Sequence, residues 1–296
     1  MASRVFQQIY NTMDTLIVGY TLGDSSIAAM GACSSIYEMM TGFTFGVGNG
    51  LAIVTARCFG RQETDRMKKS VASCIVIGVA VTLVVTILAT IFMHPLLRLL
   101  KTPAEILEES YSYISILSIF LFVMFAYNLC SGLLRAIGNS FMPLVFLIFS
   151  SLVNIVLDLL FIGAFHWGVW AAAVATTISQ AVSMILCMIH LMKKGTIYQV
   201  ELKKLHIDRE MLGQIIRYGL PSGVQNSVIG FANVIVQSNI NSFGKVAMAA
   251  YGAYSKLEGF AFLPVTSFTM ALTTFVGQNL GAGLHDRAKK GSRFGI

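Results

Sequence analysis

Charged residues are scarce in this chain. They make up 12% of its 296 residues, against 55% for hydrophobic residues, and the mean hydropathy is +0.72. Soluble domains carry roughly 25% charged residues, so the composition excludes a soluble globular protein. Apolar runs of about 20 residues, the length that crosses a bilayer, recur along the whole sequence and leave no room for a separate soluble domain.

Sequence signatures of enzymes, disulfides and metal sites are also missing. The five cysteines lie within or beside apolar segments without any CxxC spacing, which is typical of packing residues. No HExxH or GxSxG motif is present. We therefore expect no bound cofactor and no enzymatic activity. The alternative from that class, an intramembrane enzyme that uses buried carboxylates, would need a nucleophile or ligand set that the sequence does not offer.

The basic residues mark the orientation of the chain. Most of the 21 lysines and arginines fall in short gaps on one side of the apolar segments, and they do not alternate with aromatic residues on a soluble face. This pattern argues against a nucleic-acid partner and follows the positive-inside rule. It predicts a multi-pass protein of the cell membrane, of the bacterial inner-membrane type, with a cytoplasmic N-terminus and the lipid bilayer as its surroundings.

The apolar segments predict an all-α membrane protein, a polytopic helical bundle. Eight membrane-crossing helices fit the sequence, at about 3–21, 27–57, 71–94, 110–134, 140–164, 168–192, 211–242 and 246–279.

An internal repeat organises these segments. The loop Asp65-Arg66-x-Lys68-Lys69 recurs as Asp286-Arg287-x-Lys289-Lys290, and Gly60 recurs as Gly281, each displaced by 221 residues (281 − 60, 286 − 65). The repeated unit holds six spans, an even number, so both copies should enter the membrane from the same side.

The repeat predicts a six-helix N-terminal lobe at 1–195, a cytoplasmic linker at 196–210 and the first two helices of a second lobe at 211–296. A second copy of equal length would extend beyond Ile296. We therefore expect a C-terminally truncated form, and such a product could lack transport activity of its own.

An acid in the first span is the most informative polar residue. Asp14 is accompanied by Gln7, Tyr10 and Asn11 at offsets of seven, four and three residues, which predicts that they share one helix face. A carboxyl group at membrane depth is costly and often marks an ion or proton site. It can also simply join helices through hydrogen bonds. This segment alone supports the two interpretations about equally.

Further polar residues follow in the fifth and sixth spans. Asn154 and Asp158 are four residues apart, and Thr176, Gln180 and Ser183 form a stripe. If these stripes face one another, Asp14 and Asp158 share a pocket lined by neutral oxygen donors. Such a pocket suits a hard monovalent cation, or a proton shared by the two carboxyl groups.

The seventh span carries polar residues without an acid. Gln225, Asn233 and Gln237, together with Asn128 of the fourth span, could line a substrate path or could hold helices together.

The sequence resembles the multidrug and toxic compound extrusion (MATE) family along nearly its whole length. The resemblance rests on YNTMDTLIVG at 10–19, LGDSSIAAMG at 22–31, LLRAIGNSFMP at 133–143, NIVLDLLFIG at 154–163, VATTISQ at 174–180, GLPSGVQ at 219–225 and FVGQNLGAG at 275–283. It implies a twelve-helix transporter of two six-helix lobes, of which eight helices lie in this sequence. It also implies a Na⁺ or H⁺ site at Asp14, Asn154, Asp158 and Thr176, with Gln7 and Tyr10 beside it.

From the residues and the resemblance together we expect a secondary active transporter. It would export small cationic or amphipathic organic compounds in antiport with Na⁺ or H⁺, and the complete protein would be a monomer. A lipid-linked saccharide flippase of the same superfamily is the alternative within transport, and it would need a strongly basic cavity.

Overall fold

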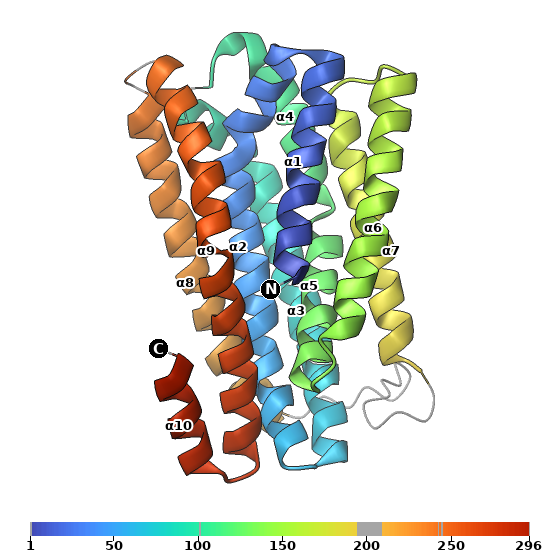
Figure 1. The fold of residues 1–296 in the computed structure, drawn as a ribbon, viewed down its shortest axis with the longest axis vertical. Coiled ribbons are helices and arrows are strands. Elements are labelled where there is room, and N and C mark those ends of the chain that lie inside the picture. The colour runs from blue at the N-terminus through green and yellow to red at the C-terminus, as the bar shows by residue number, and fades with distance from the viewer. Residues whose placement is uncertain (1, 101, 194–208, 242, 244, 296) are drawn as a thin grey trace.

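The computed structural model describes residues 2–100, 102–193, 209–241, 243 and 245–295, and every regular element in these ranges is a helix (Figure 1). This confirms the predicted all-α class. Most of the predicted linker, 196–208, lies outside the described residues, and Arg209 and Glu210 already belong to the next helix. The helices are α1 (Ala2–Leu22), α2 (Asp24–Gly60), α3 (Thr64–Leu99), α4 (Ala104–Ile119), α5 (Leu121–Ala136), α6 (Phe141–Asp158), the π-helix η1 (Leu159–Ala164), α7 (Trp170–Leu191), α8 (Arg209–Asn241), α9 (Lys245–Gly281) and α10 (His285–Gly295).

These helices account for all eight predicted spans. The fourth span is a pair, α4 and α5, bent by 47° where they meet, and the fifth is α6 continued by η1. Five helices of the described part are long and apolar enough to cross a membrane, or six if the bent pair is one span. The helices at the first and seventh predicted spans, α1 and α8, do not pass that test, because polar residues interrupt their apolar surfaces.

The helix α2 runs through the centre of the bundle. Its most apolar stretch is 61% buried, against 11% for that of α3, which lies at the periphery. On one side α2 contacts α8 and α9, and on the other it contacts α1, α3, α4 and α5 (Figure 1). An exposed apolar surface such as that of α3 is expected where a helix faces lipid.

The 221-residue repeat reappears in the helix boundaries. The helix α2 ends at Gly60 and α9 ends at Gly281, and the following helices begin at Thr64 and His285. Each pair of positions differs by 221. The two copies therefore share helix boundaries as well as identical residues at equivalent positions.

The turn after each of these two helices has the same backbone. Gln62 and Gly283 occupy equivalent positions with left-handed φ angles of 59° and 75°. In each copy the next N–H donates to the carbonyl five residues earlier, Glu63 to Cys58 at 3.2 Å and Leu284 to Asn279 at 2.9 Å. This is the Schellman arrangement that ends a helix.

The two copies meet where α2 and α9 end. A Cβ atom added at Gly60 would overlap the backbone of Gln278, and one added at Gly281 would overlap the backbone of Arg57, which is the repeat equivalent of Gln278. The contact is therefore reciprocal, as expected for two copies related by an approximate two-fold axis. Only glycine allows backbones to approach so closely.

Side chains reinforce this junction. Arg57 Nη1 donates to the Tyr218 hydroxyl at 3.0 Å, and its guanidinium lies 4.8 Å from the centre of the Tyr218 ring. At the equivalent position, Gln278 Nε2 donates to the Ala136 carbonyl at 2.8 Å. Both residues thus tie one copy to the other.

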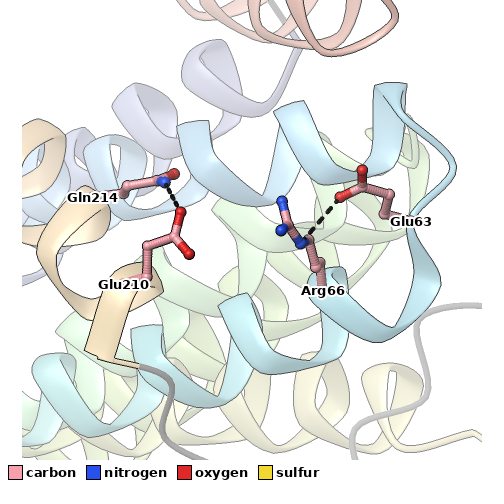
Figure 2. Close-up of polar contacts among 4 residues, drawn as sticks. All are labelled: Glu63, Arg66, Glu210 and Gln214. Atoms are coloured by element: carbon pink, nitrogen blue, oxygen red, sulfur yellow. Dashed lines mark hydrogen bonds and ion pairs between the residues drawn. The ribbon is translucent and has the colours of Figure 1, made fainter.

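The same end of the bundle carries exposed charges. Figure 2 shows Arg66 facing Glu63 beside the α2–α3 turn, with 3.6 Å between Nε and Oε2. It also shows Gln214 donating to Glu210 at 3.3 Å in the first turns of α8. Exposed contacts of this kind contribute at most about 1 kcal/mol, so their main effect is to keep this end of the bundle in water.

Candidate cation site

Four polar side chains from three helices lie together inside the bundle. Asp14 of α1 is 6% exposed, Asn154 and Asp158 of α6 are 0% exposed, and Thr176 of α7 is 5% exposed. Thr176 Oγ1 donates to Asp14 Oδ2 at 3.3 Å, and the carboxyl groups of Asp14 and Asp158 interact directly with each other. The structure therefore brings together the four residues that the sequence and the resemblance selected. That they bind a cation stays a prediction.

The local backbone at Asp158 is unusual. The helix α6 ends at this residue and continues as the π-helix Leu159–Ala164. Short π-helical segments widen a helix by one residue per turn and are frequent at functional sites. The change in helix type thus coincides with the more deeply buried of the two acids.

Unpartnered polar atoms are concentrated at this cluster. Within the described residues, Asp14 Oδ1, both carboxyl oxygens of Asp158 and both side-chain polar atoms of Asn154 are buried without a hydrogen-bond donor or acceptor. Buried polar groups are normally paired, so such a group calls for a physical explanation. A proton between the carboxyl groups, or a cation bound by their oxygens, would satisfy these atoms.

The chemistry of the donors indicates which cation fits. The unpartnered atoms include carboxylate and amide oxygens, which are hard ligands. In the described part of the chain, no group of three or more His, Cys, Asp or Glu residues could hold a metal ion. Two carboxyl groups with an amide and a hydroxyl suit Na⁺ or H⁺. A single positive charge offsets part of the negative charge of the two carboxylates, and no third acid is needed to hold it.

Two tyrosines that the sequence did not single out lie at the site. Tyr37 of α2 is close to Asp14 and to the Gln180 amide, and Tyr113 of α4 is close to both acids. A single phenol within an apolar helix is common as a packing residue. The pattern alone could therefore not select these two.

The predicted neighbours of the site are divided. Gln7 and Gln180 line a small cavity next to the cluster, whereas Asn11 is exposed and lies outside it. The prediction that Asn11 shares the face of Asp14 is wrong. Successive residues of a helix are rotated by about 100° around its axis. Asn11, three positions from Asp14, is therefore rotated by about 60° from it, whereas Gln7, seven positions away, is rotated by only about 20°. The side chain of Tyr10, also predicted to lie there, is outside the described part of the structure.

The predicted substrate-path residues do not form one buried group. Asn128 and Gln237 are partly buried, and Gln225 and Asn233 are exposed. Asn226, which neighbours Gln225 in α8, packs against Gly42 and Gly46 of α2. This part of the stripe therefore serves helix packing, which was the other interpretation of the stripe.

Solved structures define the class of fold. The structure superposes on "Outward-facing conformation of a multidrug resistance MATE family transporter of the MOP superfamily" with a TM-score of 0.90 and 23% identity, covering 100% of this chain and 66% of that chain. "Crystal structure of MATE in the bent conformation" gives a TM-score of 0.88 at 24% identity, with the same coverage. The fold is that of the MATE transporters, which are all-α membrane proteins.

The chain belongs to the MatE family, whose profile matches residues 1–160 and 221–296. Among curated relatives, it is 29% identical over its whole length to "Probable multidrug resistance protein YoeA" of Bacillus subtilis (strain 168). It is 24% identical over 94% of its length to "Multidrug export protein MepA" of Staphylococcus aureus (strain MRSA252). The chain spans 65% and 62% of the length of these two relatives.

Proposed function

We propose that the protein exports small cationic or amphipathic organic compounds in antiport with Na⁺ or H⁺. The observation that carries this proposal is that Asp14 and Asp158 interact inside the bundle, where both are buried and Thr176 donates to Asp14. Family membership and the relatives, which are named as multidrug resistance and multidrug export proteins, support the substrate class.

The carboxyl pair can couple ion binding to a change in packing. Two carboxylates in contact repel each other unless a proton or a cation lies between them, so the pair and its ligand behave as one unit. The acids come from different helices, α1 and α6, which pack against each other. Binding or release of one positive charge therefore changes the attraction between α1 and the rest of the lobe, and it can shift the balance between two conformations of the transporter.

We further propose that the protein lies in the cell membrane as a monomer with a cytoplasmic N-terminus. The excess of basic residues on that side supports the orientation. A cysteine at Ala2 should react with a membrane-impermeant maleimide in inverted membrane vesicles and not in intact cells. The opposite labelling pattern would overturn the orientation.

Transport in proteoliposomes tests the function directly, with the fluorescent cation ethidium as the probe. An inward Na⁺ gradient or an inward proton gradient is imposed separately, with the membrane potential clamped. We expect one of the gradients to drive ethidium outward against its own gradient, and an ionophore that dissipates that gradient to stop the movement.

Two results would count against this proposal. Ethidium efflux that is equal with and without both gradients would exclude antiport. Movement of a fluorescent lipid-linked saccharide in place of ethidium would favour the flippase alternative. Empty liposomes provide the baseline for both probes.

A further inference from the structure

An apolar groove runs along the side of the bundle, with walls from α3 and the end of α7 and with α5 between them. Its volume is about 420 Å³, within the range of about 300–1,000 Å³ that small-molecule sites occupy. Its lining includes none of the four residues of the candidate cation site. The groove is therefore a separate feature of the structure.

The groove has a buried floor and an exposed rim. Phe125, Leu129 and Leu133 of α5 are buried, whereas Val79 and Leu83 of α3 are more than half exposed. The groove is thus open sideways along α3, the helix whose apolar surface is expected to face lipid.

Polar atoms take almost no part in the surface of the groove. The lining residues, all within the described part of the chain, are uncharged. Thr82 Oγ1 donates to the Gly78 carbonyl of its own helix at 2.7 Å, and Thr86 Oγ1 is buried below the surface. The walls therefore suit a hydrocarbon chain and offer no partner to a charged group.

The length of the groove matches the hydrocarbon layer of one leaflet. On α3 the lining extends from Ile75 to Ile87, and twelve residues of helix rise by about 18 Å. The hydrocarbon core of a bilayer is about 30 Å thick, so one leaflet contributes about 15 Å. A single acyl chain that lies along the groove would be covered over most of its length.

A lysine follows each wall at the same end of the groove. Lys68 lies seven residues before Ile75, an offset that rotates it by only about 20° around α3 and places it about 10 Å further along the axis. On the other wall, Lys193 directly follows Met192. Both lysines are exposed. The headgroup layer extends about 5–8 Å beyond the hydrocarbon core, so the two lysines lie close to the level of the headgroups.

We propose that this groove binds one acyl chain of an anionic phospholipid, whose headgroup lies between Lys68 and Lys193. The lipid belongs to the leaflet at which α3 begins, which is the cytoplasmic leaflet in the orientation proposed above. Basic sites between membrane helices on that side are known to hold anionic headgroups. The binding needs neither the coupling ion nor a transported compound.

Photo-crosslinking tests this lipid site. The protein in phosphatidylcholine nanodiscs receives a trace of phosphatidylglycerol or phosphatidylcholine that carries the same photoactivatable acyl chain, and mass spectrometry locates the adducts. We expect phosphatidylglycerol to label Val79 and Leu83 at least about fivefold more than phosphatidylcholine does, because each lysine near the membrane surface favours an anionic lipid by about that factor. Unlabelled phosphatidylglycerol should compete with the labelling.

Charge variants test the role of the two lysines. Lys68→Gln/Lys193→Gln should lower the labelling by phosphatidylglycerol at least about fivefold and leave that by phosphatidylcholine unchanged. Lys289→Gln/Lys290→Gln is the matched control, because it removes the same charge from α10, where Lys289 is the repeat equivalent of Lys68 (289 − 68 = 221). Equal loss of labelling in the two double variants would overturn the headgroup site.

A second pair of variants tests the groove itself. Ala126→Trp places a large ring in the groove and should lower the labelling by both lipids, whereas Ala80→Trp, at an exposed position of α3 outside the groove, should not. Unchanged labelling in folded Ala126→Trp would overturn the proposal. So would equal labelling of the wild-type groove by the two lipids, a result that needs no variant.

Other occupants of the groove would give different results. Loss of the labelling on addition of ethidium would assign the groove to the transported compound. A dimer that Ala126→Trp converts to a monomer would assign it to a second copy of the chain. Either result would overturn the lipid site. Gradient-driven ethidium transport is measured separately, so failure of the antiport proposal would not be mistaken for failure of this one.

Discussion

The helices α1 and α8 occupy equivalent places in the two copies of the repeat, yet Asp14 of α1 has no acidic counterpart in α8. Asp14 corresponds to Ile235 (235 − 14 = 221), and the first is 6% exposed whereas the second is 49% exposed. Gln7 corresponds to Val228, which is also exposed. At these two positions the repeat preserves the helix and does not preserve the polar side chains.

The packing of these two helices differs in the same way. The helix α8 lies closely along α2, and Gly219, Gly223 and Gly230 contact α2 side chains and backbone directly. The helix α1 instead packs against α6 with its polar face inside the lobe. Close glycine packing fixes a helix in place, whereas contact through a charged pair depends on what the pair has bound. We therefore propose that α1, and not α8, is the helix that responds to the coupling ion.

The largest effect is expected where the two copies cross. Gly60→Ala and Gly281→Ala would each place a methyl group against the partner backbone, which cannot move aside as a side chain can. Overpacking of this kind costs about 1–3 kcal/mol. Thermal unfolding in detergent should show a lowered Tm for both variants.

Gly31→Ala is the matched control, because nothing lies within 4 Å of a Cβ atom at that helical position. It should leave the Tm unchanged or raise it, since alanine favours helix over glycine by about 1 kcal/mol. Equal Tm values for Gly60→Ala and Gly31→Ala would show that the crossing is less tight than described.

At the site of the first copy we expect an effect on the ion dependence of transport and not on the stability of the fold. Thr176→Val removes the hydroxyl that donates to Asp14 and keeps the shape of the side chain. A hydrogen bond to a charged group contributes about 1.5–3 kcal/mol, so the apparent affinity for the coupling ion should change by at least about tenfold. The half-saturating Na⁺ concentration or pH of ethidium transport measures this change.

The adjacent residue supplies the control for that variant. Thr177 donates to the Ala173 carbonyl of its own helix, so Thr177→Val should leave the ion dependence unchanged. If both valine variants shifted the ion dependence equally, the hydroxyl of Thr176 would have no special role.

The smallest effect is expected at the side-chain contact that joins the copies. Tyr218→Phe removes the hydrogen bond from Arg57 and keeps the ring beneath the guanidinium, so it should cost only about 0.5–1.5 kcal/mol of unfolding free energy. Tyr218→Leu also removes the ring and should cost more. A leucine variant as stable as the phenylalanine variant would remove the cation–π contact from the account.

Much of this arrangement follows from the sequence. Apolar segment length predicted the helices, and the 221-residue offset anticipated the matching ends of α2 and α9. Asp14, Asn154 and Asp158 stood out because an acid or amide within an apolar helix is costly unless it finds partners. Thr176 belonged to a polar stripe, and the resemblance to the MATE family joined it to the other three. Helical spacing then grouped Asn154 with Asp158.

Other features depend on contacts between helices, which the spacing of residues along the sequence does not predict. Asn11 is turned out of the site because helical angles accumulate by about 100° per residue and a three-residue offset falls beside the polar face. Tyr37 and Tyr113 come to the acids from α2 and α4, and only the packing of these helices reveals it. The break between α4 and α5 and the π-helix after Asp158 carry no proline or glycine signal at the point where they begin.

The most direct test of the central claim replaces each acid in turn and measures gradient-driven ethidium transport in proteoliposomes. Asp14→Asn and Asp158→Asn keep the size of the side chain and remove its charge, and Ile235→Asn places the same amide at the equivalent position of the second copy. We predict loss of gradient-driven transport in both acid variants, with folded protein retained, and retained gradient-driven transport in Ile235→Asn, because Ile235 is 49% exposed and is not part of the buried site. Wild-type transport in Asp14→Asn and Asp158→Asn would contradict the claim that these two carboxyl groups form the coupling site.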